Sequence, residues 1–215
     1  MTILHIRSSI RTFVHRLSFR NRYMHLRNTD VTIFCSNCVG GVIYHDLGLR
    51  FMSPTINLFM RPSDFVLFCS DLPKYLETEL TELDTDKPYP CGCLDGIRID
   101  FVHYKSFQEA RAKWVERSKR VNLANCCAIL VDRDGCSVDD IRAFDRLPIE
   151  CKAILTSQRH EGVSCEVANR RWASSVQEQG VVDLCAYRSP LSASRWIDDF
   201  DYVELLNRAG GINGK

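Results

Sequence analysis

After residue 30, the chain alternates short apolar runs with amphipathic stretches, a pattern typical of α/β proteins. Residues 126–131 are continuously apolar, which predicts a strand buried on both faces of a sheet, and residues 151–156 (CKAILT) predict the next buried strand. Residues 31–34 predict a third buried strand, residues 97–104 alternate like a fourth, and residues 55–60 resemble a fifth. Helical spacing of apolar positions predicts helices over residues 63–80, 107–121 and 138–147.

Strands that alternate with helices through short connections favour right-handed βαβ units. The predicted fold class is therefore α/β, with a largely parallel, Rossmann-like sheet flanked by helices. We expect residues 31–207 to form a single domain, with a polar connection over 81–95, further helices over 166–179 and 199–206, and a flexible tail at 208–215.

Residues 1–30 form a separate segment, in which six arginines face a single acid, Asp30. Apolar residues recur between these arginines at helical spacing, so the segment predicts a basic amphipathic helix. Such a helix can lie on an anionic membrane surface through residues 3–27. The alternative is a helix docked on its own domain with a solvated basic face.

Composition narrows the possible partners and the compartment. Across 215 residues the net charge is only +1, which gives no general attraction to nucleic acid, so we expect no nucleic-acid partner. No apolar run approaches the ~18 residues that a transmembrane helix requires. The eleven cysteines are odd in number and irregularly spaced, and we see no export signal. We therefore expect reduced thiols in a cytoplasmic protein.

Polar residues follow four of the predicted strands, at 36–38, 103–106, 132–134 and 157–160. Ligands of open α/β sheets bind outside the carboxyl ends of the strands, so these groups should converge on one edge. Cys38 is the first candidate, because Gly40, Gly41 and a predicted helix follow it. Unpaired N–H groups there would lower the pKa of the thiol and could hold an oxyanion.

This arrangement predicts a nucleophile with its base. In it His103 is the general base of Cys38, Asp132 orients His103, and His45 is the competing base. The alternative is that Cys38 is a packed thiol. The remaining predicted substrate-binding residues are Asn37, Gly40, Gly41, Asp46, Tyr104, Lys105, Ser106 and Arg133.

Two metal sites are also possible from the pattern. Asp132 and Asp134, directly after a buried strand, resemble the Asp-x-Asp element with which many glycosyltransferases hold a divalent ion on a nucleotide-sugar. Cys35 and Cys38 could join Cys91 and Cys93 in a zinc site. No dinucleotide fingerprint, phosphate-binding loop or His-Glu-x-x-His is present, which disfavours nicotinamide dehydrogenases, P-loop enzymes and zincins.

Several motifs, taken in order, resemble an uncharacterised bacterial family that is catalogued as a domain of unknown function and described as exopolysaccharide biosynthesis proteins. They are Cys38 with Gly40-Gly41, residues 43–49 (IYHDLGL), 53–55 (SPT), 101–107 (FVHYKSF), 132–135 (DRDG) and 200–203 (FDYV). The similarity covers residues 30–207. It implies a setting in the assembly or decoration of surface polysaccharide, and it implies no particular reaction. Where the family pattern has Ser-Asn-Asn-Cys, this chain has Cys35-Ser36-Asn37-Cys38.

The leading hypothesis is an acyl or O-acetyl transferase that acts on a saccharide or lipid-linked saccharide precursor with a donor such as acetyl-CoA. One alternative is a glycosyltransferase that uses a divalent cation, held by Asp132 and Asp134, and a nucleotide-sugar. Another is a non-catalytic scaffold at the membrane. The expected location is cytoplasmic, with peripheral binding to the inner face of the plasma membrane.

Overall fold

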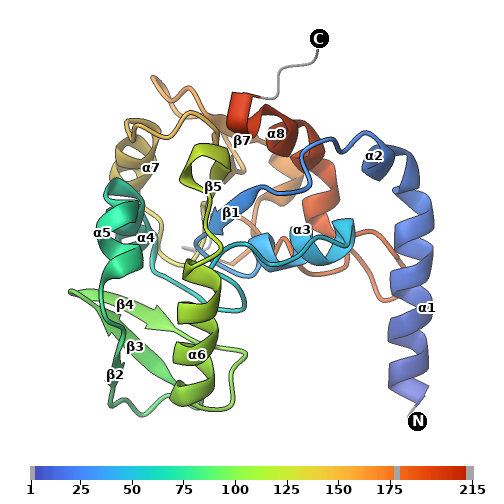
Figure 1. Cartoon of the computed structure of the whole chain (residues 1–215). Helices are drawn as coiled ribbons and strands as arrows, with labels where there is room; N and C mark the ends of the chain where they lie inside the picture. The colour runs from blue at the N-terminus through green and yellow to red at the C-terminus, as the bar shows by residue number, and fades with distance from the viewer. Residues whose placement is uncertain (1–2, 177–179, 212–215) are drawn as a thin grey trace.

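The computed structural model describes residues 3–176 and 180–211, and its centre is a four-stranded parallel sheet (Figure 1). The strand order is β1-β5-β6-β7, from β1 (Thr32–Cys35), β5 (Cys126–Val131), β6 (Lys152–Thr156) and β7 (Glu166–Ala168). Every neighbouring pair in this sheet is parallel. The prediction of an α/β fold with a largely parallel sheet is confirmed.

Both faces of the sheet are covered, which explains why β1, β5 and β6 are mostly apolar. Side chains alternate between two cores: Ile33, Ile129 and Leu155 enter one, whereas their neighbours Phe34 and Leu130 enter the other. The first core is closed by helices α3 (Val39–Leu47) and α8 (Tyr202–Arg208), the second by α4 (Pro62–Ser70), α6 (Phe107–Ser118) and α7 (Val138–Asp145).

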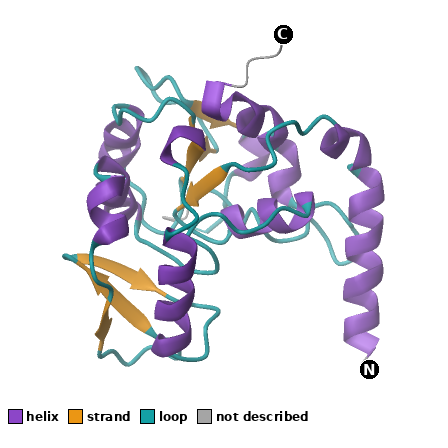
Figure 2. Ribbon diagram, in the orientation of Figure 1, coloured by secondary structure: helices purple, strands orange, loops and turns teal. Residues whose placement is uncertain are grey.

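A second, three-stranded antiparallel sheet lies apart from the first (Figure 2). It consists of β2 (Thr81–Leu83), β3 (Cys91–Leu94) and β4 (Ile97–Asp100). The turn between β3 and β4 is Asp95-Gly96, with φ of 48° and 88°, as expected for an Asp-Gly hairpin turn. Residues 97–104 therefore do not join the parallel sheet, and the expectation of one converging edge for all four polar groups is wrong for residues 103–106.

Other predicted elements differ in their bounds or type. Residues 55–60 contribute a single bridge between Phe59 and Asp100 rather than a strand. The predicted helix over 63–80 is divided into α4 and α5 (Leu72–Glu77), because Asp71 begins a new helix by accepting the Lys74 N–H. The predicted helix over 166–179 is wrong for its described part, which holds β7 and a 3₁₀ turn (Arg170–Trp172), and residues 177–179 lie outside the described residues.

The two ends of the described chain are helical. Helices α1 (Ile3–Ser18) and α2 (Arg20–Met24) stand at one side of the domain in Figure 1. Near the other end, the 3₁₀ helix Trp196–Asp199 precedes α8. The predicted tail starts at the last residue of α8, Arg208, and continues into a 3₁₀ turn (Ala209–Gly211) in which Ala209 is buried, whereas residues 212–215 lie outside the described part. A further 3₁₀ helix, Leu123–Asn125, leads into β5.

Candidate functional site

Three of the four polar groups predicted from the sequence meet at one edge of the parallel sheet. Residues 36–38 follow β1, residues 132–134 follow β5, and residues 157–160 follow β6. Because these strands are parallel, their carboxyl ends share an edge. The candidate site is this carboxyl edge.

Cys38 does not have the thiolate character expected of a nucleophile. It directly precedes α3 and is partly buried, and its burial together with the Asp183 carboxylate raises the pKa of the thiol to about 11. Cys38 is the N-cap residue of α3, but its side chain makes no capping hydrogen bond, and it is Asn37 Oδ1 that accepts the Val39 N–H at 3.1 Å. The expectation of a lowered thiol pKa is wrong, because loss of hydration outweighs the helix N-terminus.

Cys35 is the cysteine that lies against the backbone N–H groups of this turn. Its burial raises the pKa of the thiol to about 12, against an opposing effect of the Asn37 and Gly40 N–H groups. A Cβ on Gly40 would lie 2.8 Å from Cys35 Cβ, and one on Gly41 would lie 3.3 Å from Asn57 Oδ1. The two glycines therefore let α3 pack closely on β1 and the 56–57 segment, a structural role that accounts for them.

His103 lies in an exposed turn after β4, outside the parallel sheet. Across the described residues, no hydrogen bond or ion pair joins His103 to Cys38 or Asp132. The structure thus does not bring the predicted Cys-His-Asp combination together.

The polar residues Tyr104 and Ser106, which follow His103, make hydrogen bonds within the protein. The Tyr104 hydroxyl donates to the Ile56 carbonyl at 2.9 Å and accepts from the Arg117 guanidinium at 2.7 Å. Ser106 caps α6 by accepting the Glu109 N–H, as its position predicts, and the Lys105 side chain is exposed. Tyr104 therefore connects α6 to the 56–57 segment, and its ring is not free to stack on a substrate.

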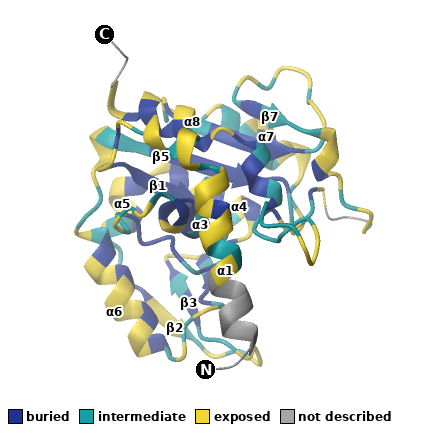
Figure 3. Ribbon diagram, turned by 90° about the vertical axis from the view of Figure 1, so that its right-hand side faces the viewer, coloured by how far each residue is buried: buried dark blue, intermediate teal, exposed yellow. Residues whose placement is uncertain are grey.

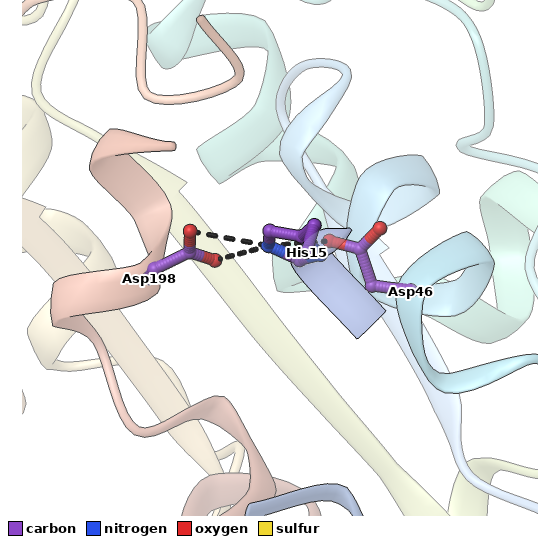
Figure 4. Close-up of side chains that lie close together, drawn as sticks. All are labelled: His15, Asp46 and Asp198. Atoms are coloured by element: carbon purple, nitrogen blue, oxygen red, sulfur yellow. Dashed lines mark hydrogen bonds and ion pairs between the residues drawn. The ribbon is translucent and has the colours of Figure 1, made fainter. Parts of the chain in front are cut away.

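Asp46, predicted to bind substrate, is buried in a charged cluster (Figure 4). Its Oδ2 accepts a hydrogen bond of 2.5 Å from Arg195 Nη1 and lies 3.9 Å from His15 Nε2. His15 Nε2 in turn lies 3.0 Å from Asp198 Oδ1, and the Arg195 N–H donates to Asp198 Oδ2 at 2.6 Å. His45 is only at the rim, with a side chain that is 54% exposed and Nδ1 3.4 Å from Asp46 Oδ1.

This charged cluster joins α1, α3 and the 3₁₀ helix Trp196–Asp199. Among the described residues, His15, Asp46 and Asp198 are the one group of three potential metal ligands whose ligand atoms all lie within 4.8 Å of one another. However, the Arg195 guanidinium already supplies a cation in contact with Asp46. The cluster is therefore a compensated ion network that holds α1 on the domain. Within the described part of the chain, Cys35, Cys38, Cys91 and Cys93 do not come together as a group of potential metal ligands, so the predicted zinc site is wrong.

Asp132, which follows β5, remains a candidate catalytic residue. It is 9% exposed, and burial raises the pKa of its carboxyl group, while His160 lowers this pKa and Glu166 raises it. A Cβ on Gly180 would lie 2.3 Å from the Asp132 carbonyl oxygen, so the chain passes directly over this residue. A carboxyl group with a raised pKa beside a histidine is typical of acid–base sites.

His160 and Glu166 form a dyad next to Asp132 that the sequence analysis did not select. His160 Nδ1 lies 2.6 Å from Glu166 Oε1, and the His160 N–H donates to Glu166 Oε2 at 2.8 Å. Glu166 is buried, and the His160 side chain is 12% exposed. A carboxylate only accepts, so Nδ1 carries the proton and the other ring nitrogen, Nε2, is the acceptor of the neutral ring.

A cavity of about 710 Å³ lies at the amino-terminal ends of β6 and β7. Glu166 is in its wall, but His160 and Asp132 are not. Lys152 and Arg208 also line it, and Glu150 and Glu166 match their charges, so the wall favours neither an anion nor a cation. Its size is in the range of small-molecule sites.

Asp134 and Arg133 lie on the other side of Asp132. Asp134 has a φ of 60°, and burial raises the pKa of its carboxyl group, with the Arg133 guanidinium opposing and Asp183 adding to this effect. Arg133 Nη1 donates to the Val181 carbonyl at 2.8 Å, so Arg133 secures the loop that carries Asp183. Asp183 was not predicted, because only tertiary folding brings it to the sheet edge.

A comparison with known protein families gives the family to which these residues belong. Residues 9–207 match the family described as "Domain of unknown function (DUF1919)". The chain belongs to this family. It is also similar to an uncharacterized protein of Haemophilus influenzae, with 35% identity over 199 residues that cover 93% of each chain.

The DUF1919 match spans nearly all of the parts described above. It includes most of α1, the charged cluster and the dyad at the carboxyl edge, so these belong to one family domain. None of the described helices has both the length and the apolar character that crossing a bilayer requires.

Proposed function

We propose that this DUF1919 protein is an acyltransferase of surface polysaccharide biosynthesis, with His160 as its general base. The observation that carries the proposal is the 2.6 Å contact between His160 Nδ1 and Glu166, beside the buried Asp132. Glu166 orients the ring and fixes the proton on Nδ1, which leaves Nε2 to accept a proton.

The proposed step is direct transfer to a sugar hydroxyl. His160 Nε2 takes the hydroxyl proton as the oxygen bonds to the acyl carbon of a thioester such as acetyl-CoA. The carbon–sulfur bond then breaks, and the leaving thiolate takes the proton from His160. Glu166 stabilises the imidazolium that exists between these two proton transfers. Cys38 has no part in this step, because its raised pKa keeps it a thiol at neutral pH.

The support for the polysaccharide setting is the resemblance of this chain's motifs to those of exopolysaccharide biosynthesis proteins. The proposed acceptor is a saccharide, either free or linked to a lipid through phosphate. We further propose that the protein works in the cytoplasm and binds the inner face of the plasma membrane peripherally.

A metal-dependent glycosyltransferase is the second candidate. Its specific support is that burial raises the pKa of both Asp132 and Asp134, so a divalent cation would relieve the cost of their buried charge. Mg²⁺ is often held by one or two carboxylates together with substrate phosphates. In this case His160 would activate the acceptor hydroxyl, and the donor would be a nucleotide-sugar.

The test is donor turnover by the purified full chain. Acetyl-CoA is supplied with a panel of hexoses and UDP-hexoses, and CoA release is followed by chromatography. We expect His160→Gln to lower turnover by about 10²-fold or more, in line with the loss of a general base. His103→Gln, which changes an exposed histidine, is the matched control and should retain activity.

Other outcomes separate the alternatives. Consumption of a UDP-hexose that stops with a chelator and in Asp134→Asn would establish the glycosyltransferase instead. Loss of turnover in Cys38→Ser with retention in His160→Gln would contradict the proposed base and restore the cysteine nucleophile. Absence of turnover with every donor would favour the scaffold.

A further inference from the structure

Helix α1 contacts the domain through its polar side. Arg11 Nε donates to the Ser192 carbonyl at 2.6 Å, and its guanidinium lies 3.6 Å from the centre of the Tyr187 ring. One turn later, His15 is fully buried against Asp198. An amphipathic surface helix normally turns its apolar stripe toward the core, so this orientation is the reverse of the usual one.

The apolar stripe of α1 faces solvent. Ile10, Phe13, Val14 and Leu17 are 58%, 63%, 42% and 54% exposed, at the i, i+3, i+4, i+7 spacing of a single stripe. At 100° per residue, the centre of this stripe lies about 150° around the helix from His15. Figure 3 shows the exposed side of α1 facing outward from the domain.

Exposed arginines flank this stripe. Arg16 and Arg20 have no carboxylate partner among the described residues, and Arg16 Nη2 donates only to the His45 carbonyl at 3.2 Å. Both line a cavity of about 350 Å³ between α1 and α3, together with Met24 and Leu47. The one carboxylate in that wall, Asp46, is already paired with Arg195.

We propose that the stripe of Ile10, Phe13, Val14 and Leu17 inserts into the surface of an anionic bilayer, where Arg16 and Arg20 bind lipid phosphates. The inference rests on the proposed function for its setting and adds the surface and the orientation. Interfacial helices have this arrangement, because their apolar side chains lie at the headgroup boundary and their arginines bind phosphates.

Charge decides between a bilayer and a second copy of the chain. Residues 1–29 contain six arginines and no acid. Two chains packed through their α1 stripes would bring the flanking Arg16 and Arg20 of each copy together, and the repulsion would oppose pairing. An anionic lipid surface neutralises the same charges, and about 1 kcal/mol per arginine is typical for this attraction.

The test is flotation of the full chain with phosphatidylcholine vesicles, with and without phosphatidylglycerol. We expect binding to the anionic vesicles, and about tenfold or greater weakening in Phe13→Ser/Leu17→Ser. Leu67→Ser/Val115→Ser, which removes two apolar residues that are 47% and 44% exposed on α4 and α6, is the matched control and should bind like the wild type. Arg16→Ser/Arg20→Ser should also weaken binding, unlike the α7-region control Arg142→Ser/Arg146→Ser.

Three outcomes would overturn the inference. They are equal binding to neutral and anionic vesicles, unchanged binding of Phe13→Ser/Leu17→Ser, or a lipid-free dimer that this variant converts to a monomer. His160→Gln should bind vesicles like the wild type. A failure of the catalytic proposal therefore leaves vesicle binding intact, and a failure of the membrane proposal leaves turnover of soluble donors intact.

Discussion

Removal of the Arg195 guanidinium should cost a large part of the stability of the fold. In the charged cluster, Arg195 Nη1 contacts Asp46 Oδ2 at 2.5 Å, with side-chain exposures of 10% and 0%. Arg195→Ala keeps the backbone N–H that donates to Asp198, so the substitution isolates the guanidinium. The carboxylate of Asp46 would then be buried without its guanidinium partner.

The expected magnitude follows from this burial. A buried pair that loses one partner leaves an uncompensated charge, which typically costs about 3–5 kcal/mol. A domain of this kind has a total free energy of unfolding of about 5–15 kcal/mol, so Arg195→Ala would remove a large fraction of it. Asp46→Ala in the Arg195→Ala background removes the stranded carboxylate, and the double variant should cost less than the sum of the single variants by about 0.5–3 kcal/mol.

Urea unfolding of the four proteins in this cycle measures both quantities. Arg111→Ala is the control, because its pair with Glu79 has a similar N–O distance of 2.8 Å but exposures of 51% and 74%. An exposed pair contributes at most about 1 kcal/mol. One contrary result is that Arg195→Ala lowers the free energy of unfolding no more than Arg111→Ala does, and another is that the effects of Arg195→Ala and Asp46→Ala on it are additive. Either result would refute the view that the charged cluster holds α1 on the domain.

Two further predictions concern the carboxyl edge. Because the pKa of Cys38 is about 11, its alkylation by iodoacetamide, followed by peptide mass spectrometry, should be slow at pH 7 and should accelerate up to about pH 11, and fast labelling at pH 7 would contradict the burial argument. Burial raises the pKa of Asp132 in the folded state above its ordinary value, so the folded state binds this proton more tightly and stability falls as pH rises through that window. Asp132→Asn should therefore increase the free energy of unfolding at pH 7, with no gain below the ordinary aspartate pKa, and a loss at pH 7 would show that the carboxylate stabilises the fold.

The sequence predicts three of the four strands of the central sheet, because β1, β5 and β6 are mostly apolar and mostly buried. The fourth strand, β7, was not predicted, because it is only three residues long and two of its residues are partly exposed. The antiparallel sheet was missed because β2 and β3 are short and weakly patterned. Gly92 in β3 is set by packing alone, since a Cβ there would lie 2.8 Å from Leu80 Cδ1.

The candidate site was predicted only in part. Asp132 was found because the residues after a parallel strand reach a defined edge. The pKa of Cys38 could not be predicted, because Asp183, 145 residues later in the chain, and the burial of the thiol together outweigh the helix N-terminus. The His160 and Glu166 pair could have been predicted from the sequence, because His160 ends the polar group after β6 and Glu166 begins the next strand.

The orientation of the apolar stripe of α1 also could not be predicted from the sequence. The helical spacing predicts that a stripe exists, but not which side of the helix docks. The direction is set by His15 and Arg11, whose partners Asp198 and Ser192 come from the far end of the chain.

The state of the His160 ring tests the central claim most directly. Long-range ¹H–¹⁵N NMR of the histidine side chains, assigned through His160→Gln, reports which ring nitrogen carries the proton. The account predicts that the proton of the neutral ring is on Nδ1, and that this preference is lost in Glu166→Gln, because the carboxylate of Glu166 selects this tautomer. A proton on Nε2, or the same tautomer with and without the Glu166 carboxylate, would contradict His160 as the base.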